Sequence, residues 1–209
     1  MTIKNVPFVS NTLDDTHCLQ AAYMSIAKYF DPEFDISMDE WSIVTGYEEG
    51  LGTWCSAGLV WFKEHGYEVK HYEVFDFNEF IDNPRDYMIA VHGAVAGQWG
   101  IEHTNVPAET ERMKRLLSAN IVEKREPNFD DIKAGLDDGY LPRVTINAHK
   151  LDHTDGYIGH AVVIIGYDDD TIQLHDPGLP ALPNRRVSIE DFMAAWSDQE
   201  KELDLIRLA

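Results

Sequence analysis

The stretch Gly159–Pro177, which reads GHAVVIIGYDDDTIQLHDP, decides the fold of this chain. Two runs rich in β-branched and apolar residues flank a short polar turn around Asp168–Asp170, a pattern typical of a β-hairpin. The first run is continuously apolar, which predicts an internal strand of a sheet that is covered on both faces. Because a hairpin folds back on itself, we expect His160 at its start and Asp176 at its end to be neighbours.

A carboxylate next to an imidazole fixes the tautomer of the ring and stabilises its protonated form. Such a pair usually serves a nucleophile, for which Cys18 is the best candidate. After this cysteine, apolar residues recur at helical spacing, at Leu19, Ala22, Tyr23, Ile26, Ala27 and Phe30. We therefore predict that Cys18 lies in the first turn of a buried central helix, where unpaired N–H groups and the helix dipole favour a thiolate.

The remaining pattern places helices mainly in the first two thirds of the chain and strands in the last third. Helices are predicted over residues 37–45, 53–65, 77–81, 87–99, 108–119, 128–139 and 188–196. Strands are predicted over residues 6–9, 67–72, 121–124, 141–147, 185–187 and 203–208, with loops over 148–156 and 177–183. This segregation predicts an α+β fold with an antiparallel sheet, in a single domain over residues 1–209.

The composition excludes several classes of partner. The chain has 37 acidic and 17 basic residues and a formal net charge of −20, so we expect binding neither to nucleic acid nor to anionic lipid. The start of the chain lacks the apolar core of a signal peptide, and no run approaches the roughly 20 apolar residues of a membrane span. Cys18 and Cys55 form no C-x-x-C motif, which predicts free thiols and a cytoplasmic location.

Three motifs together carry a resemblance to a known family. They are the cysteine that opens an Ala-rich helix (Thr16–Ala22), the hairpin that ends in His175-Asp176-Pro177, and the closing helix around Val187–Phe192. The chain resembles the papain-like cysteine peptidases of the bacteriocin-processing type, which remove double-glycine leader peptides, and especially their stand-alone relatives. The resemblance covers residues 6–30 and 129–196. It is weaker between them, where we expect a helical insertion at about 35–125.

The resemblance implies a papain-like fold, in which a helical half with a central Cys-bearing helix packs on a C-terminal antiparallel sheet. It implies that Cys18 is the nucleophile, His160 the base and Asp176 the group that orients the imidazole. The family has a glutamine six residues before the cysteine, and Thr12 stands at that position here. The nearest side-chain amide is Asn11, which we expect to contribute to the oxyanion hole together with the backbone N–H of Cys18.

The expected function is that of a thiol hydrolase, a peptidase or amidase that acts on a peptide or small amide through an acyl-enzyme, without cofactor or metal. With an amine as acceptor, the same site would be an acyl or peptidyl transferase. A second hypothesis is a non-catalytic peptide-binding module on the same fold, in which Cys18 is a structural thiol. A metal site formed by His149, Asp152, His153, Asp155 and His160 is disfavoured, because these residues lie in a polar loop without a helical frame.

Overall fold

The computed structural model describes residues 2–198 and 201–209. Its helices are α1 (Cys18–Phe30), α2 (Met38–Thr45), α3 (Ser56–Glu64), α4 (Phe77–Asp82), α5 (Pro84–Glu102), α6 (Val106–Ser118), α7 (Phe129–Asp137), α8 (Ala148–Leu151) and α9 (Ile189–Trp196). Its strands are β1 (Thr2–Ile3), β2 (Tyr67–Glu73), β3 (Val122–Lys124), β4 (Leu141–Asn147), β5 (Gly159–Tyr167), β6 (Thr171–Asp176), β7 (Leu182–Ser188) and β8 (Leu203–Leu208). No helix within these residues is long and apolar enough to cross a membrane.

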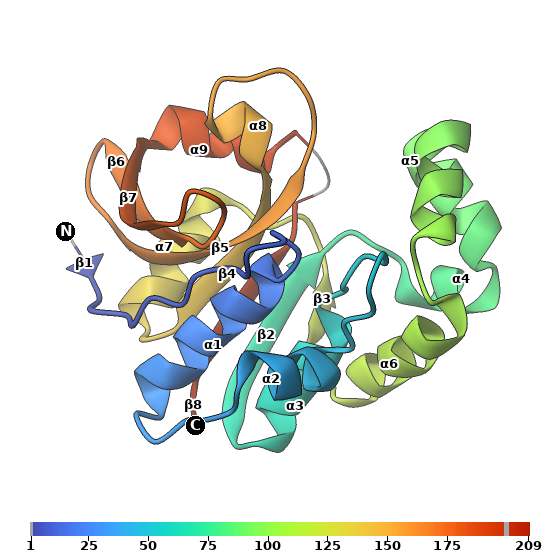
Figure 1. Ribbon diagram of the computed structural model, residues 1–209, viewed down its shortest axis with the longest axis horizontal. Coiled ribbons are helices and arrows are strands. Elements are labelled where there is room, and N and C mark those ends of the chain that lie inside the picture. Colours follow the sequence, from blue (N-terminus) through green and yellow to red (C-terminus); the bar gives the residue numbers. More distant parts are fainter. Residues whose placement is uncertain (1, 199–200) are drawn as a thin grey trace.

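Within the described residues, eight strands form one sheet in the order β3-β2-β8-β4-β5-β6-β7, with β1 paired to β5. Neighbouring strands run antiparallel, except that β2 and β3 are parallel. Helices α1, α2 and α3 cover one face of the sheet, and α7 and α9 cover the other (Figure 1). The predicted α+β fold is therefore confirmed, and the one parallel pair is the exception to the antiparallel sheet that we expected.

The hairpin has the form that its sequence predicts. Strands β5 and β6 pair in antiparallel register, and the side chain of Asp168 closes the turn by accepting hydrogen bonds from the backbone of Asp170 and Thr171. The apolar run of β5 divides between two cores. Val163 packs in the core beneath α1, and Val162 packs in the core beneath α9. Burial on both faces explains why this strand is apolar without alternation.

Helix α1 is the central helix that the spacing predicts, with the bounds Cys18–Phe30. Its residues Leu19–Ala27 are all buried, because the helix lies between the sheet and the helices α2 and α3. Ala21 and Ala22 allow the close approach to β5 that such a position requires. The helix thereby holds Cys18, its first residue, at the end of β5 where His160 lies.

The predicted edge strand over residues 6–9 is wrong. The structure has extended coil there, and the short strand β1 precedes it. Two backbone groups of this segment form hydrogen bonds with side chains instead of with a neighbouring strand. The N–H of Val9 donates to Ser25 Oγ, and the carbonyl of Val6 accepts from the ring of His175. These bonds satisfy the backbone and tie the N-terminal segment to α1 and β6.

Two loop predictions near the hairpin also differ from the structure. Residues 148–151 form the short helix α8, which Asn147 caps through a hydrogen bond from the N–H of His149. Strand β7 begins at Leu182, five residues after Pro177, because its pairing with β6 extends beyond the apolar part of the strand. Both differences arise from hydrogen bonds that hydrophobic periodicity does not reveal.

The stretch at about 35–125, expected as a helical insertion, also contributes strands β2 and β3 to the sheet. Within it, α5 is longer than predicted and is broken at Gly93, whose φ of 82° favours glycine. The second part of α5 packs back on the first, and a Cβ at Gly97 would lie 2.3 Å from the carbonyl oxygen of Met88. Helices α4 and α5 lie to one side of the sheet (Figure 1).

A fully buried ionic network joins β2, β4 and β8 beneath α1. Asp204 accepts hydrogen bonds from Arg143 Nε at 2.6 Å and from the hydroxyl of Tyr23 at 2.8 Å, and it contacts His71 Nδ1 at 2.6 Å. Burial opposes the charge on Asp204, but Arg143 and His71 outweigh it and hold the pKa of this carboxyl below its usual value. Asp204 thus lies between two buried cationic groups, and each of them has a second carboxylate partner, Glu73 for His71 and Glu202 for Arg143.

We expect Asp204→Asn to lower the free energy of unfolding by about 3–5 kcal/mol, because it removes the fully buried carboxylate that Arg143 and His71 share. Urea unfolding followed by circular dichroism measures the change. The control is Asp130→Asn, which removes an exposed ion pair with Lys133 and should leave the stability almost unchanged. An Asp204→Asn variant as stable as this control would contradict the account of the network.

Candidate active site

Three elements bring the predicted site residues together. Cys18 is the first residue of α1, His160 is the second residue of β5, and Asp176 is the last residue of β6. Asp176 Oδ1 lies 2.7 Å from His160 Nε2, and the imidazole of His160 lies close enough to Cys18 to lower the pKa of its thiol. The structure therefore brings together the three residues that the hairpin and the helix spacing predicted to meet.

Both oxygens of Asp176 have additional partners. The backbone N–H of Gly178 donates to Oδ1 at 3.1 Å, and Arg185 Nη1 donates to Oδ2 at 2.7 Å. Burial raises the pKa of Asp176, but the bonds with His160 and Arg185 outweigh it, so the net shift is downward. Arg185 also reaches Asp152 at 2.5 Å, which fixes its guanidinium. The carboxylate thus stays ionised and has one orientation toward the imidazole.

The electrostatics favour charged forms of both His160 and Cys18. Burial disfavours the imidazolium, but the neighbouring Asp176 and Cys18 outweigh it and raise the pKa of His160 to about 10. Burial likewise disfavours the thiolate, but His160 and the backbone N–H groups of Ala161 and Leu19 lower the pKa of Cys18. A thiolate next to an imidazolium is the form of a cysteine that attacks carbonyl carbon.

The other cysteine has the opposite environment. Cys55 is buried just before α3, and desolvation raises the pKa of its thiol well above the ordinary value. The neighbouring carboxylates of Glu202 and Asp204 raise it further. Cys55 is therefore protonated at neutral pH, and the two thiols of the chain differ strongly in their expected reactivity.

Asn11 lies buried in the turn that precedes α1. Its Oδ1 accepts hydrogen bonds from the backbone N–H groups of Thr12 and His17, at 2.9 and 2.7 Å, and its Nδ2 donates to Asp15 at 2.7 Å. Its own N–H donates to the carbonyl of Pro177, just after Asp176. Asn11 thus shapes the turn that presents Cys18 and links this turn to the end of the hairpin. Among the residues that the structure describes, Nδ2 has only this one partner, so its second amide hydrogen is available to a ligand.

Sequence reasoning missed two residues that support Asp176. Gly178 packs directly on the pair, so that a Cβ there would lie 3.2 Å from both Asp176 Oδ1 and His160 Cε1. Arg185 reaches Asp176 from β7, the strand paired with β6. The only sequence signal for Arg185 was a basic residue in a short strand just after the hairpin. Its orientation depends on a register shift near Asp176 that the sequence does not reveal.

The five residues of the disfavoured metal hypothesis are not brought together. His149 bonds to Thr154, and Asp152 bonds to Arg185. Elsewhere among the described residues, Cys55, His71 and Asp204 lie close enough to share an ion. The second oxygen of Asp204 is held by the guanidinium of Arg143, however, and a cation beside that group would be repelled. We therefore assign no metal to this cluster.

Comparison with known proteins agrees with the fold. The chain aligns over 97% of its length with 98% of the peptidase domain of Streptococcus ComA, a bifunctional ABC transporter involved in quorum sensing, at 12% identity and a TM-score of 0.51. The chain also aligns over 99% of its length with 97% of a Bacillus anthracis protein described as a C39-like peptidase, at 15% identity and a TM-score of 0.52. No curated protein matches the chain.

At such identities, these two structures show that the papain-like fold of C39 peptidase domains is shared. The family assignment comes from the sequence itself, because the profile of the peptidase C39-like family matches residues 3–203, nearly the whole chain. The protein therefore belongs to the peptidase C39-like family.

Proposed function

We propose that the protein is a thiol hydrolase that cleaves an amide bond in a peptide, with Cys18 as nucleophile, His160 as general acid and base, and Asp176 as the orienting group. The observation that carries this proposal is the buried contact between His160 and Asp176, with Cys18 next to the same imidazole. Membership of a peptidase family supports a peptide substrate.

In the proposed reaction, the thiolate of Cys18 attacks the carbonyl carbon, and His160 gives its proton to the leaving amine. The resulting thioester is the acyl-enzyme. The neutral imidazole then takes a proton from water, whose oxygen attacks the thioester and releases the acid. Loss of the thiolate from the second tetrahedral intermediate restores the starting ion pair. Asp176 keeps the ring oriented in both steps and stabilises the imidazolium.

The oxyanion that forms in each step needs hydrogen-bond donors. The backbone N–H of Cys18 has no partner within α1, because it belongs to the first turn of that helix. The second donor that we propose is the remaining amide hydrogen of Asn11, since Thr12 replaces the family's glutamine. The hydroxyl of Thr12 is already engaged with Asp14 at 2.5 Å and His17 at 2.8 Å.

A peptide-binding module without catalysis is the competing function, and the replaced glutamine favours it. A binding module does not need an activated thiol, however, and the opposite pKa shifts of Cys18 and His160 favour an enzyme. A transferase would use the same acyl-enzyme with an amine in place of water. Product analysis by mass spectrometry distinguishes the transferase from the hydrolase.

Alkylation with iodoacetamide tests the activated thiol. Because the pKa of Cys18 is lowered, its alkylation rate should fall less between pH 8.5 and 6.5 than the rate of an ordinary thiol with a pKa near 8.5, which loses about 98% of its thiolate over this range. His160→Ala removes the main partner that stabilises the Cys18 thiolate, so the pH profile of Cys18 alkylation should move toward higher pH. Mass spectrometry of each cysteine peptide measures the rates.

Cys55 is the internal control for this experiment. It should stay unmodified in the folded protein at every pH in that range and react in urea. Equal, slow alkylation of both cysteines, or a profile that His160→Ala leaves in place, would contradict the activated thiol and favour the binding module.

Digestion of a peptide mixture tests the activity itself. We expect the native protein to produce new termini and Cys18→Ala to produce none, because the proposed reaction begins with attack by the Cys18 thiolate. Mass spectrometry identifies the products and the bond cleaved. Cleavage that persists at the native rate in Cys18→Ala would overturn the assignment of the nucleophile.

A swap of two side chains tests Asn11 as an oxyanion donor. In the double variant Asn11→Asp with Asp15→Asn, the hydrogen bond between the two residues can form in reverse, while position 11 keeps its acceptor oxygen and loses its N–H₂. If Asn11 is the donor, kcat should fall on the order of 10²–10³. The control is Asp15→Asn alone, which keeps the amide of Asn11. Equal kcat values for the two variants would show that Asn11 only shapes the turn.

A further inference from the structure

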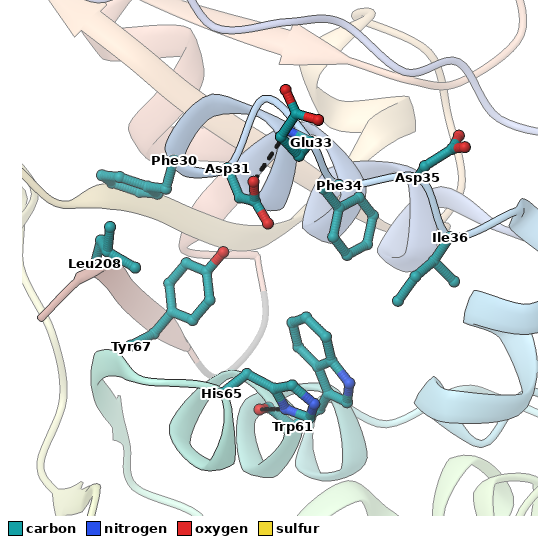
Figure 2. Close-up of a pocket in the computed structure, with 10 residues that line it drawn as sticks. All are labelled: Phe30, Asp31, Glu33, Phe34, Asp35, Ile36, Trp61, His65, Tyr67 and Leu208. Atoms are coloured by element: carbon teal, nitrogen blue, oxygen red, sulfur yellow. Dashed lines mark hydrogen bonds between the residues drawn. The ribbon is translucent and has the colours of Figure 1, made fainter.

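A cavity of about 470 Å³ lies at the end of α1 opposite to Cys18. It opens between the end of α1, the segment before α2, the end of α3 and the start of β2 (Figure 2). A helix of 13 residues is about 20 Å long, so the cavity is separate from the proposed active site. Neither the fold nor the proposed reaction requires an open space at this position.

Aromatic rings form the walls of this cavity. Figure 2 shows the rings of Phe34 and Trp61 pointing into the space from opposite sides, with Tyr67 beside them. The ring centres of Phe34 and Trp61 are 5.9 Å apart, and His65 stacks on the outer side of Trp61 at 4.0 Å. Each ring belongs to a separate element, and the buried positions of Phe34 and Tyr67 fix the shape of the wall.

The rim of the cavity is acidic. Asp31, Glu33 and Asp35 all line it, and the carboxylate of Asp31 points inward toward the hydroxyl of Tyr67, whereas Glu33 and Asp35 point away (Figure 2). None of the three carboxylates forms a salt bridge with a residue that the structure describes. Among the hydrogen bonds of the described residues, the side chain of Asp31 accepts only one, from the backbone N–H of Glu33 at 3.0 Å.

A second cavity, of about 440 Å³ between α3 and α6, provides a contrast. Four of its charged side chains are paired with one another, Arg115 with Glu64 and Lys114 with Glu111. Within the part of the chain that the structure describes, the cavity at Asp31 has no basic partner of this kind. It combines π faces, which attract cations, with an uncompensated carboxylate at its mouth.

We propose that this cavity binds the side chain of an arginine or lysine in a basic peptide segment of another protein. The aliphatic part of such a side chain would lie against the partly exposed Trp61, and its charged end would reach Asp31. Arginine fits best, because its planar guanidinium can stack on an aromatic ring while it donates to a carboxylate.

The charge of the whole chain supports a basic partner. With a net charge of −20, two copies of this chain repel each other, whereas a basic segment is attracted before it makes contact. The proposal does not depend on the proposed hydrolase activity, since it concerns a different end of α1. A free alkylamine has the same charged group as a lysine side chain, and the experiment below distinguishes a peptide ligand from a free amine.

The experiment is a titration of the ¹⁵N-labelled full chain, followed by NMR, with the peptide acetyl-Gly-Ser-Arg-Ser-Gly-amide. The matched peptide carries citrulline, which has the shape of arginine without its charge. We expect the arginine peptide to bind about tenfold more tightly than the citrulline peptide, with the largest shifts at Trp61 and Tyr67. Free butylamine is the third probe, and it should bind more weakly than the arginine peptide.

The variant Asp31→Asn should remove most of the difference between the two peptides. Asn can still accept the bond from the N–H of Glu33, so the local turn is retained. Asp35→Asn is the matched control, because it removes the same charge from a side chain that points away from the cavity, and it should change the Kd less than about twofold.

Several results would overturn the proposal. The native chain could bind the arginine and citrulline peptides equally, show no saturable binding, or show its largest shifts elsewhere on the surface. Equal effects of Asp31→Asn and Asp35→Asn would also overturn it, because they would indicate diffuse attraction to an acidic surface. Butylamine binding as tight as the arginine peptide would assign the cavity to free amines instead. The comparison of the two peptides on the native chain stands even if Asp31→Asn does not fold.

Discussion

The contact between His160 Nε2 and Asp176 Oδ1, 2.7 Å long and buried, is the interaction on which the proposed chemistry depends. It joins the two ends of the hairpin and leaves the other ring nitrogen for Cys18. Asp176 can act in this way because Arg185 and the backbone of Gly178 keep it ionised and oriented. The fold contributes the rest, since a buried helix packed on β5 places the thiol at the end of the hairpin where the imidazole of His160 lies.

The sequence predicted this arrangement because the relevant signals are local. The continuous apolar run of β5 identified a covered strand, the polar turn identified a hairpin, and helical spacing identified α1 with its observed bounds. The antiparallel sheet followed from the segregation of helices and strands. The two ends of a hairpin lie close together in space. For that reason, the proximity of His160 and Asp176 could be predicted from the sequence alone.

The rest could not be predicted, because it depends on contacts between distant segments. Arg185 reaches Asp176 through a register shift, and the segment around Val6 bonds to side chains of α1 and β6 rather than to a strand. The buried network around Asp204 joins residues from three strands, β2, β4 and β8, which no periodicity relates. The amide of Asn11 was identified by elimination, and its bonds to Thr12, His17 and Asp15 show a structural role that the sequence did not indicate.

The charge state of His160 is the most direct test of the proposed thiolate–imidazolium pair. NMR of the ring nitrogens, with ¹⁵N-labelled histidine and assignment by His160→Gln, follows its protonation as the pH is raised. The account predicts that His160 remains an imidazolium at pH 8 and loses its proton only near the pKa of about 10. In Cys18→Ala, which lacks the thiolate, the proton should be lost at lower pH. A His160 that titrates near its ordinary pKa of about 6.5, alike in both proteins, would contradict the ion pair and with it the proposed mechanism.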